Sequence, residues 1–220
     1  MSELRLTFVK EGRAAWISHL DLLRTFQRVF IRSGLVIRHS KGFHPHPIMS
    51  FVLPLSVGQT SVCELLDFST VEDLSPEGMP ERLNPYLPEG VRVLSCAAPV
   101  HPVRDMRYLE AEVTLEYDKG VPAGAAEAVC TLLLGDQVVV ERRNKKKQMV
   151  DTDIRPMIAS VTARTEEKAL VLSVRVQGQN PGVNPALLAA AVGRHLPELK
   201  PDFVRVRRTA LLCEDGSAFC

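Results

Sequence analysis

The sequence lacks the signals that mark several common protein classes. No apolar run approaches the length of a membrane span, and the first residues, M-S-E-L-R-L, contain no signal-peptide core. The five cysteines form no C-x-x-C pair and their number is odd, which predicts reduced and mostly buried thiols. Walker loops, the G-x-G-x-x-G motif and nucleophile elbows are missing as well. We therefore expect a cytoplasmic protein without membrane contact, nucleotide cofactor or catalytic triad.

An excess of charge of either sign is also missing, because the net charge is +1. The charges are nevertheless unevenly distributed along the chain. Residues 1–50 contain eight Lys or Arg and three acidic residues, whereas residues 51–90 contain one Arg and seven acidic residues. A basic surface and an acidic surface can therefore coexist on a nearly neutral protein.

Hydrophobic periodicity in residues 4–97 predicts an α+β unit. Apolar residues alternate or cluster in four runs of strand length, and two stretches have helical spacing and helix-type ends. The predicted order is strand 4–9, helix 18–33, strands 48–55 and 61–68, helix 76–87 and strand 91–97. This β-α-β-β-α-β order is the ferredoxin-like pattern.

The second half of the chain predicts a less regular repeat of that order. Expected elements are strands 108–117, 169–176 and 203–212, helices 122–134 and 184–196, and an extra strand or hairpin between residues 138 and 163. We therefore predict tandem ferredoxin-like units with antiparallel sheets: a domain of residues 1–98, a linker of residues 99–105 and a second domain of residues 106–220. A single larger α+β domain is the alternative.

The predicted helix 18–33 has recognisable signals at both ends. Ser18 can cap the first turn, with Asp21 in the place of the acidic capping-box residue. Gly34 suits the left-handed position that follows the last turn of many helices. Residues at three- and four-residue steps form an apolar face: Leu22, Phe26, Val29 and Phe30.

Three arginines form a stripe roughly opposite this apolar face. Arg24, Arg28 and Arg32 are each four residues apart, and no acidic residue occurs at that spacing within the helix. A solvated helix face is one interpretation of the stripe. Because clustered, unpaired guanidinium groups suit phosphate oxygens, contact with nucleic acid is the interpretation that we favour.

A stiff loop, R-H-S-K-G-F-H-P-H-P, follows at residues 38–47. Its two prolines restrict the backbone, and its cations and histidines are potential hydrogen-bond donors. We expect Arg38 and Lys41 to hold phosphates, together with the arginine stripe. Phe43 has two interpretations, a plug of the core or a stacking partner for a base. His39, His44 and His46 are expected to set the shape of the bound nucleic-acid segment or to recognise it.

The loop histidines have two alternative roles. His44 and His46 suit a general acid and base that cleave RNA, because histidine titrates near neutral pH. With His39 and His19 they also suggest a zinc site, but Pro45 separates the closest pair and no cysteine is near. We therefore expect no metal.

A second basic run occurs in the predicted C-terminal domain. Its five cations are Arg142, Arg143, Lys145, Lys146 and Lys147. Such a block is typical of a solvated hairpin tip, and it also attracts phosphate backbones without sequence preference.

Two long stretches, F-V-K-E-G-R-A-A-W-I-S-H-L-D-L-L-R-T-F-Q-R-V-F-I-R-S-G and S-K-G-F-H-P-H-P-I-M-S-F-V-L-P-L-S-V-G, resemble a bacterial family of unknown function. The resemblance continues more loosely through M-V-D-T-D-I-R-P-M-I. Members of that family are linked to radical-SAM proteins, standing alone or fused behind a cobalamin-binding one. The resemblance therefore implies such a protein as partner. The three-cysteine cluster motif C-x-x-x-C-x-x-C is absent from this chain, so we expect no iron–sulfur cluster and no other cofactor here.

These observations lead to three functional hypotheses. The first is an RNA-binding accessory protein that presents a structured tRNA or rRNA segment to the radical-SAM partner. The second is a metal-independent endoribonuclease that uses His44 or His46, since the order of elements is similar to that of tandem ferredoxin-like enzymes that process CRISPR RNA. That similarity concerns the fold and transfers no function by itself. The third is a protein–protein adaptor without nucleic acid.

Overall fold

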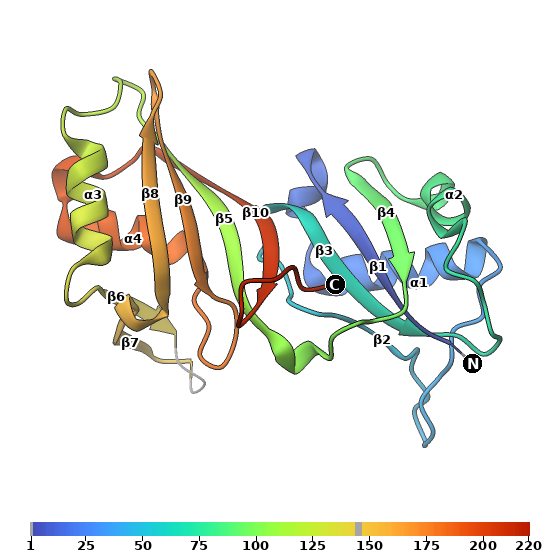
Figure 1. Cartoon of the computed structure of the whole chain (residues 1–220). Coiled ribbons are helices and arrows are strands. Elements are labelled where there is room, and N and C mark those ends of the chain that lie inside the picture. The colour runs from blue at the N-terminus through green and yellow to red at the C-terminus, as the bar shows by residue number, and fades with distance from the viewer. Residues whose placement is uncertain (1, 144–146) are drawn as a thin grey trace. The chain divides into compact units, whose positions relative to one another are not determined.

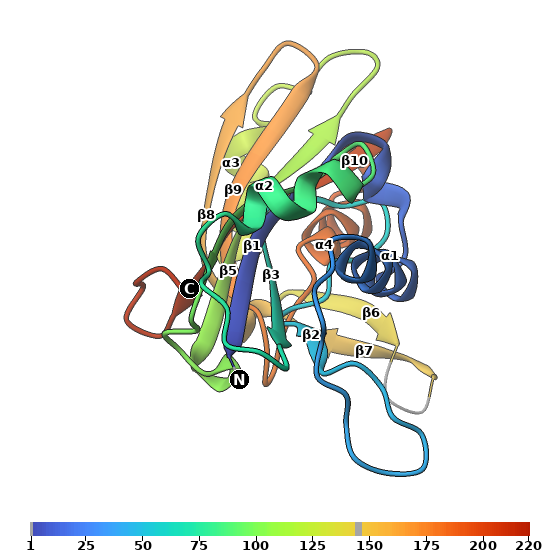
Figure 2. The ribbon, with the colours of Figure 1, turned by 90° about the vertical axis from the view of Figure 1, so that its right-hand side faces the viewer.

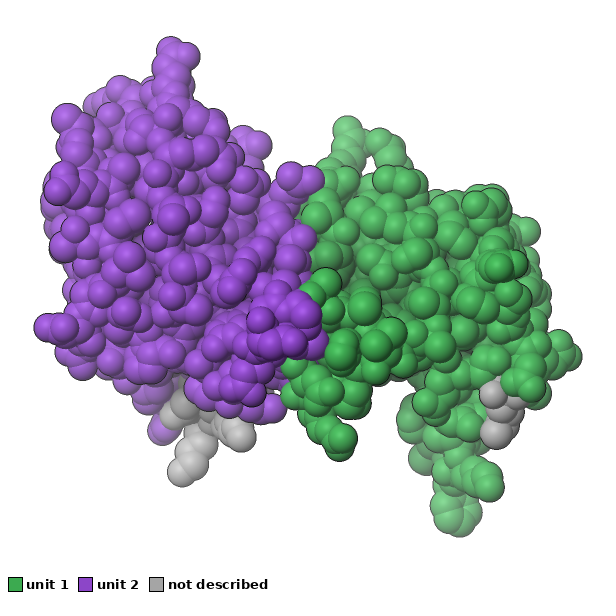
Figure 3. Space-filling model, viewed as in Figure 1, with its two compact units in different colours: residues 1–105, 218–220 green, residues 106–217 purple. Residues whose placement is uncertain are grey.

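The computed structural model describes residues 2–143 and 147–220. It contains two α+β units, shown in different colours in Figure 3. Unit 1 consists of residues 1–105 and 218–220, and unit 2 consists of residues 106–217. The predicted linker, residues 99–105, belongs to unit 1 and ends in the short 3-10 turn η3 (Val103–Asp105).

Unit 1 has the predicted β-α-β-β-α-β order. Its elements are β1 (Glu3–Lys10), α1 (His19–Arg32), β2 (Met49–Phe51), β3 (Thr60–Ser69), α2 (Met79–Leu83) and β4 (Val91–Ala97), with the 3-10 turns η1 (Gly12–Trp16) and η2 (Asn84–Tyr86). The strands lie side by side in the order β4-β1-β3-β2, and every pair is antiparallel (Figure 1). The predicted helix 76–87 is therefore shorter than expected and continues as a 3-10 turn.

The core of unit 1 lies between its sheet and its two helices. Alternate residues of β1 face the helices, and Phe8 packs against Phe26 of α1 with ring centroids 5.0 Å apart. Phe30 stacks on Phe68 of β3 at 4.9 Å. Met79 and Leu83 of α2 belong to the same cluster, so both helices cover one face of the sheet.

Unit 2 repeats this plan with an insertion. Its elements are β5 (Met106–Glu116), α3 (Ala125–Leu134), β6 (Val139–Arg143), β7 (Met149–Asp153), η4 (Arg155–Met157), β8 (Ile158–Thr165), β9 (Ala169–Gln177), α4 (Ala186–His195), η5 (Pro197–Leu199) and β10 (Phe203–Cys213). Four strands form an antiparallel sheet in the order β10-β5-β9-β8. The pair β6–β7 is a separate hairpin, the predicted extra element.

The Asp153-Ile154-Arg155-Pro156 segment returns the chain from this hairpin to the sheet. The Oδ1 atom of Asp153 accepts hydrogen bonds from the backbone N–H of Val138 (2.9 Å) and of Arg155 (3.0 Å). The guanidinium of Arg155 donates to the carbonyls of Gly135 (2.8 Å) and Ile158 (2.9 Å). Its side chain thus satisfies backbone acceptors at a corner, which gives this segment a structural role.

The cysteines are free, as expected, but they are less buried than predicted. Cys213 is buried, Cys63, Cys96 and Cys130 are half-buried, and Cys220 is exposed. Burial raises the pKa of the Cys96 thiol to about 11, so this thiol is protonated at neutral pH. Within the described residues, no helix has both the length and the apolar character needed to cross a membrane.

Candidate nucleic-acid interface

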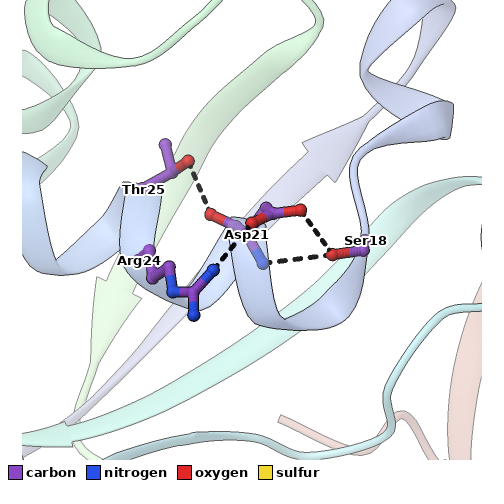
Figure 4. Close-up of polar contacts among 4 residues, drawn as sticks. All are labelled: Ser18, Asp21, Arg24 and Thr25. Atoms are coloured by element: carbon purple, nitrogen blue, oxygen red, sulfur yellow. Dashed lines mark hydrogen bonds and ion pairs between the residues drawn. The ribbon is translucent and has the colours of Figure 1, made fainter.

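Helix α1 is fixed at both ends by the residues that the sequence indicated. The Ser18 hydroxyl accepts a hydrogen bond from the backbone N–H of Asp21 (3.2 Å) and donates to the Oδ2 atom of the same residue (2.7 Å) (Figure 4). At the other end, Gly34 has a φ of +71°, and Leu35 N–H bonds to the carbonyl of Phe30 (2.8 Å). This is a Schellman ending, so local contacts set where the helix begins and ends.

The arginine stripe of α1 is exposed, but one of its members has a partner. The Nη1 atom of Arg24 lies 3.2 Å from Oδ1 of Asp21, so the prediction of three unpaired arginines is wrong for Arg24 (Figure 4). The reason is geometric, because residues three apart also meet on a helix surface. The hydrogen bond from Ser18, followed by the Arg24 guanidinium, lowers the pKa of the Asp21 carboxyl. The charge of Arg28 also acts on the Asp21 carboxylate, whereas Arg32 has no side-chain partner among the described residues.

Residues 38–47 form a narrow projection of unit 1, the GFHPHP loop. Figures 1 and 2 both show it as a light-blue loop between α1 and β2 that extends away from the rest of the unit. His39 and Pro47 form an isolated bridge at its base, and Ser40 N–H bonds to the carbonyl of His46 (2.9 Å). The Ser40 hydroxyl also lies 2.9 Å from Nδ1 of His46 and accepts from its backbone N–H (3.1 Å).

These contacts leave the tip of the GFHPHP loop to solvent. Lys41, Phe43, His44 and Pro45 are all exposed, and the side chain of Phe43 is 101% exposed. The interpretation of Phe43 as a plug of the core is therefore wrong. The cross-loop bonds of Ser40 and the two prolines hold the ring away from the core, so it is available to a ligand.

The histidines occupy different environments. His39 bonds through Nδ1 to the carbonyl of Ile37 (3.0 Å) at the base of the loop, so this nitrogen carries the proton. His46 is held by Ser40, whereas no side chain among the described residues orients the exposed ring of His44. No group of three His, Cys, Asp or Glu side chains in residues 2–143 and 147–220 is placed to hold a metal ion.

The second basic run lies at the β6–β7 hairpin of unit 2. Arg142 is half-buried and donates to the carbonyl of Gly182 (3.3 Å), while Arg143 donates to the carbonyl of Lys147 (3.1 Å). Lys145 and Lys146 lie outside the described residues. Arg142 therefore contributes to the structure of unit 2, and Arg143 and Lys147 are the exposed cations among the described members of the run.

An apolar groove in unit 1 was not indicated by the sequence. It has a volume of about 510 Å³ and lies between the second half of α1 and the base of the GFHPHP loop, where His39 and Pro47 line it. Its apolar lining includes Ile31, Val36 and Val71, which are 76%, 59% and 50% exposed. Periodicity cannot reveal such a groove, because these residues come from three different segments.

An exposed indole was also missed. Trp16 is 73% exposed at the end of η1, although its neighbours Ala14 and Ala15 are buried. The residue that positions its ring, Gly58, is distant in sequence, so no local pattern gives the arrangement.

A family model matches most of the chain. The family described as "Uncharacterized protein conserved in bacteria (DUF2344)" matches residues 3–185. No curated protein matches the chain significantly.

Solved structures give a likeness of fold alone. A chain of the "Crystal Structure of a Cbf5-Nop10-Gar1 Complex" aligns with a TM-score of 0.50 and 10% identity, over 94% of this chain and 48% of that chain. The present chain thus spans about half the length of that relative. A chain of the "Crystal Structure of an Unknown Protein from Galdieria sulphuraria" aligns with 13% identity over 94% of this chain and 98% of that chain, but its TM-score of 0.29 carries no argument.

Proposed function

We propose that this chain, which belongs to the bacterial family DUF2344, is an RNA-binding accessory protein that contacts RNA through unit 1. The observation that carries the proposal is the complete exposure of Phe43 at the tip of a stiff, cationic loop. An exposed aromatic ring is unfavourable in water, and single-stranded RNA offers bases that stack on such rings. Lys41 beside it and the exposed Arg28 and Arg32 of α1 supply charges for phosphates.

A second proposal concerns the fold and the partner. Both units contain the β-α-β-β-α-β order and the strand order of a ferredoxin-like unit, if the β6–β7 hairpin is treated as an insertion in unit 2. We propose on this basis a tandem ferredoxin-like arrangement. The chain has no cluster motif, and its resemblance to proteins linked to radical-SAM enzymes motivates the further proposal that a cobalamin-binding enzyme of that class receives the RNA.

Binding of bulk tRNA and of a single-stranded oligoribonucleotide tests the role of Phe43. Phe43→Ala should weaken binding by about 1–3 kcal/mol, roughly 5- to 150-fold, because a stacking contact is lost. The unfolding free energy should not change, since the ring contacts no core. Tyr86→Ala is the matched control, because Tyr86 is also an exposed aromatic residue of unit 1 but lies on η2. Equal affinity of the parent and both variants would refute the stacking role of Phe43, and the absence of RNA binding would refute the proposed function.

The phosphate contacts are tested by salt dependence. Replacing Arg24, Arg28 and Arg32 with Gln should make the fall of affinity with salt concentration shallower, because fewer counterions are released.

Incubation of the protein with RNA tests the nuclease hypothesis. We expect intact RNA, since no side chain among the described residues orients His44. Cleavage that disappears in His44→Ala or His46→Ala would favour the endoribonuclease instead.

A protein-binding function is the second candidate, and the apolar groove favours it. Arg28 is three residues before Ile31, so it lies next to this groove residue on the surface of α1 and provides a positive charge there. A fitting occupant is an apolar segment of the partner enzyme that carries acidic residues along one side. Ile31→Asp should then release the partner in a pull-down, whereas Leu94→Asp, a change at an exposed residue of β4, should not.

A further inference from the structure

The single tryptophan of the chain is displayed to solvent. Trp16 is 73% exposed, although a large aromatic side chain normally buries most of its surface. Nothing in the core of unit 1 depends on the ring, because it is absent from the hydrophobic cluster. Its exposure therefore requires another explanation.

The ring nevertheless has a defined neighbour, because its six-membered part lies close to Gly58. A Cβ atom added at Gly58 would lie 3.4 Å from Cζ3 and 3.6 Å from Cη2 of Trp16. Gly58 has a φ of +84°, a conformation that favours glycine, and its N–H bonds to the carbonyl of Ala15 (2.9 Å). The indole thus lies beside a glycine backbone and leaves most of its surface to solvent.

A buried lysine holds the backbone next to the ring. The Nζ atom of Lys10 donates to the same Ala15 carbonyl (3.1 Å), although Lys10 is only 1% exposed. Glu64, which is 2% exposed, provides the opposite charge near Lys10. Two donors therefore hold the carbonyl that immediately precedes Trp16. Because this segment is already ordered, little conformational entropy is lost when the ring binds a ligand.

From this arrangement we infer that Trp16 is a preformed stacking platform for a nucleobase of single-stranded RNA. A flat ring that is 73% exposed suits a planar partner, and every base offers a flat face. Arg13 of the same 3-10 turn is exposed and supplies a cation for the adjacent phosphate. The inference rests on the proposed RNA-binding function and adds a second stacking residue to Phe43.

The fluorescence of Trp16 reports directly on this contact, because the chain has no other tryptophan. Titration of the full-length protein with a single-stranded oligoribonucleotide should quench the emission in a saturable way. Trp16→Leu should weaken binding at least about tenfold, and Trp16→Phe, which keeps a flat ring, should weaken it less. Gly58→Ala should reduce both quenching and affinity, because a side chain at a φ of +84° strains the backbone against which the ring lies.

Circular dichroism and thermal unfolding establish that each variant is folded, and Tyr86→Leu is the matched aromatic control. If RNA binds in a manner that depends on Phe43 but leaves the emission and the Trp16→Leu affinity unchanged, the platform is refuted and the RNA-binding function stands. If no RNA binds at all, both proposals fail. A change of emission that occurs only with the partner protein would also overturn the inference and would assign Trp16 to protein docking.

Discussion

At the scale of single residues, several polar side chains of unit 1 hold backbone groups in place. Lys10 illustrates this role: burial lowers its pKa, the nearby charge of Glu64 partly opposes the shift, and its ammonium group holds the Ala15 carbonyl. Buried charges are costly unless they are paired and hydrogen-bonded. We interpret this pair as a device that fixes the position of η1 and of Trp16, rather than as a source of net stability.

Asp21 gives a pH-dependent prediction. Its pKa in the folded protein is lowered from the ordinary value of 3.8, mainly by the hydrogen bond from Ser18. Because the pKa is lower in the folded protein, the carboxylate stabilises the helix at any pH above its unfolded-state pKa. This stabilisation is lost as the pH falls through its folded-state pKa. Asp21→Asn should therefore unfold more easily than the parent at pH 7, and the two proteins should converge below pH 3.8.

Urea unfolding of both proteins across this pH range provides the measurement. Asp118→Asn is a suitable control, because the Asp118 carboxylate belongs to unit 2 and lies far from α1 in sequence. A difference between parent and Asp21→Asn that stays constant down to the lowest pH would contradict the role given to the charge.

At the scale of elements, local signals were sufficient for α1 but not for its surroundings. The cap, the apolar face and the Schellman ending all lie between residues 18 and 35, so sequence spacing predicts them. The order of elements in unit 1 followed from periodicity for the same reason. The contact between Trp16 and Gly58 joins residues far apart in sequence, which no local pattern contains. The exposure of Phe43 depends on the bonds between Ser40 and His46, which residue spacing does not predict either. The pairing of Arg24 was missed although it is local, because only four-residue spacing was considered.

Two glycines give a paired prediction for the helices. Gly34→Ala places a side chain at a φ of +71° and should destabilise the protein by about 1–2 kcal/mol. Gly193 lies within α4, where an added Cβ would make ordinary contact with Lys200 at 3.5 Å. Gly193→Ala should therefore stabilise by about 0.5–1 kcal/mol. Thermal unfolding measures both, and effects of the same sign would show that the two backbone positions were misjudged.

At the scale of the whole molecule, the acidic stretch after the GFHPHP loop contains two kinds of residue. Some interact with basic side chains of the protein, and others are exposed to solvent. Glu64 is buried near Lys10, and Asp67 accepts two hydrogen bonds from Arg5 at 2.6 and 2.8 Å. Phe219 lies over the same guanidinium at 4.7 Å. These acidic residues are therefore unavailable to a partner. Glu72, Glu77 and Glu81 are exposed, and no side-chain partner for them occurs among the described residues.

RNA and the partner enzyme are expected to bind separate surfaces of the protein. Like charges repel, so the exposed acidic residues are expected to avoid RNA and to meet a basic surface of the partner. Replacing Glu72, Glu77 and Glu81 with Lys should loosen the complex in a co-purification experiment. The control replaces Glu127, Glu167 and Glu198 of unit 2 with Lys, which changes the net charge equally. Both variants should bind RNA with the same affinity, because each adds the same long-range charge. If the first variant alone loses RNA binding and retains the partner, the two surfaces have been assigned the wrong way round.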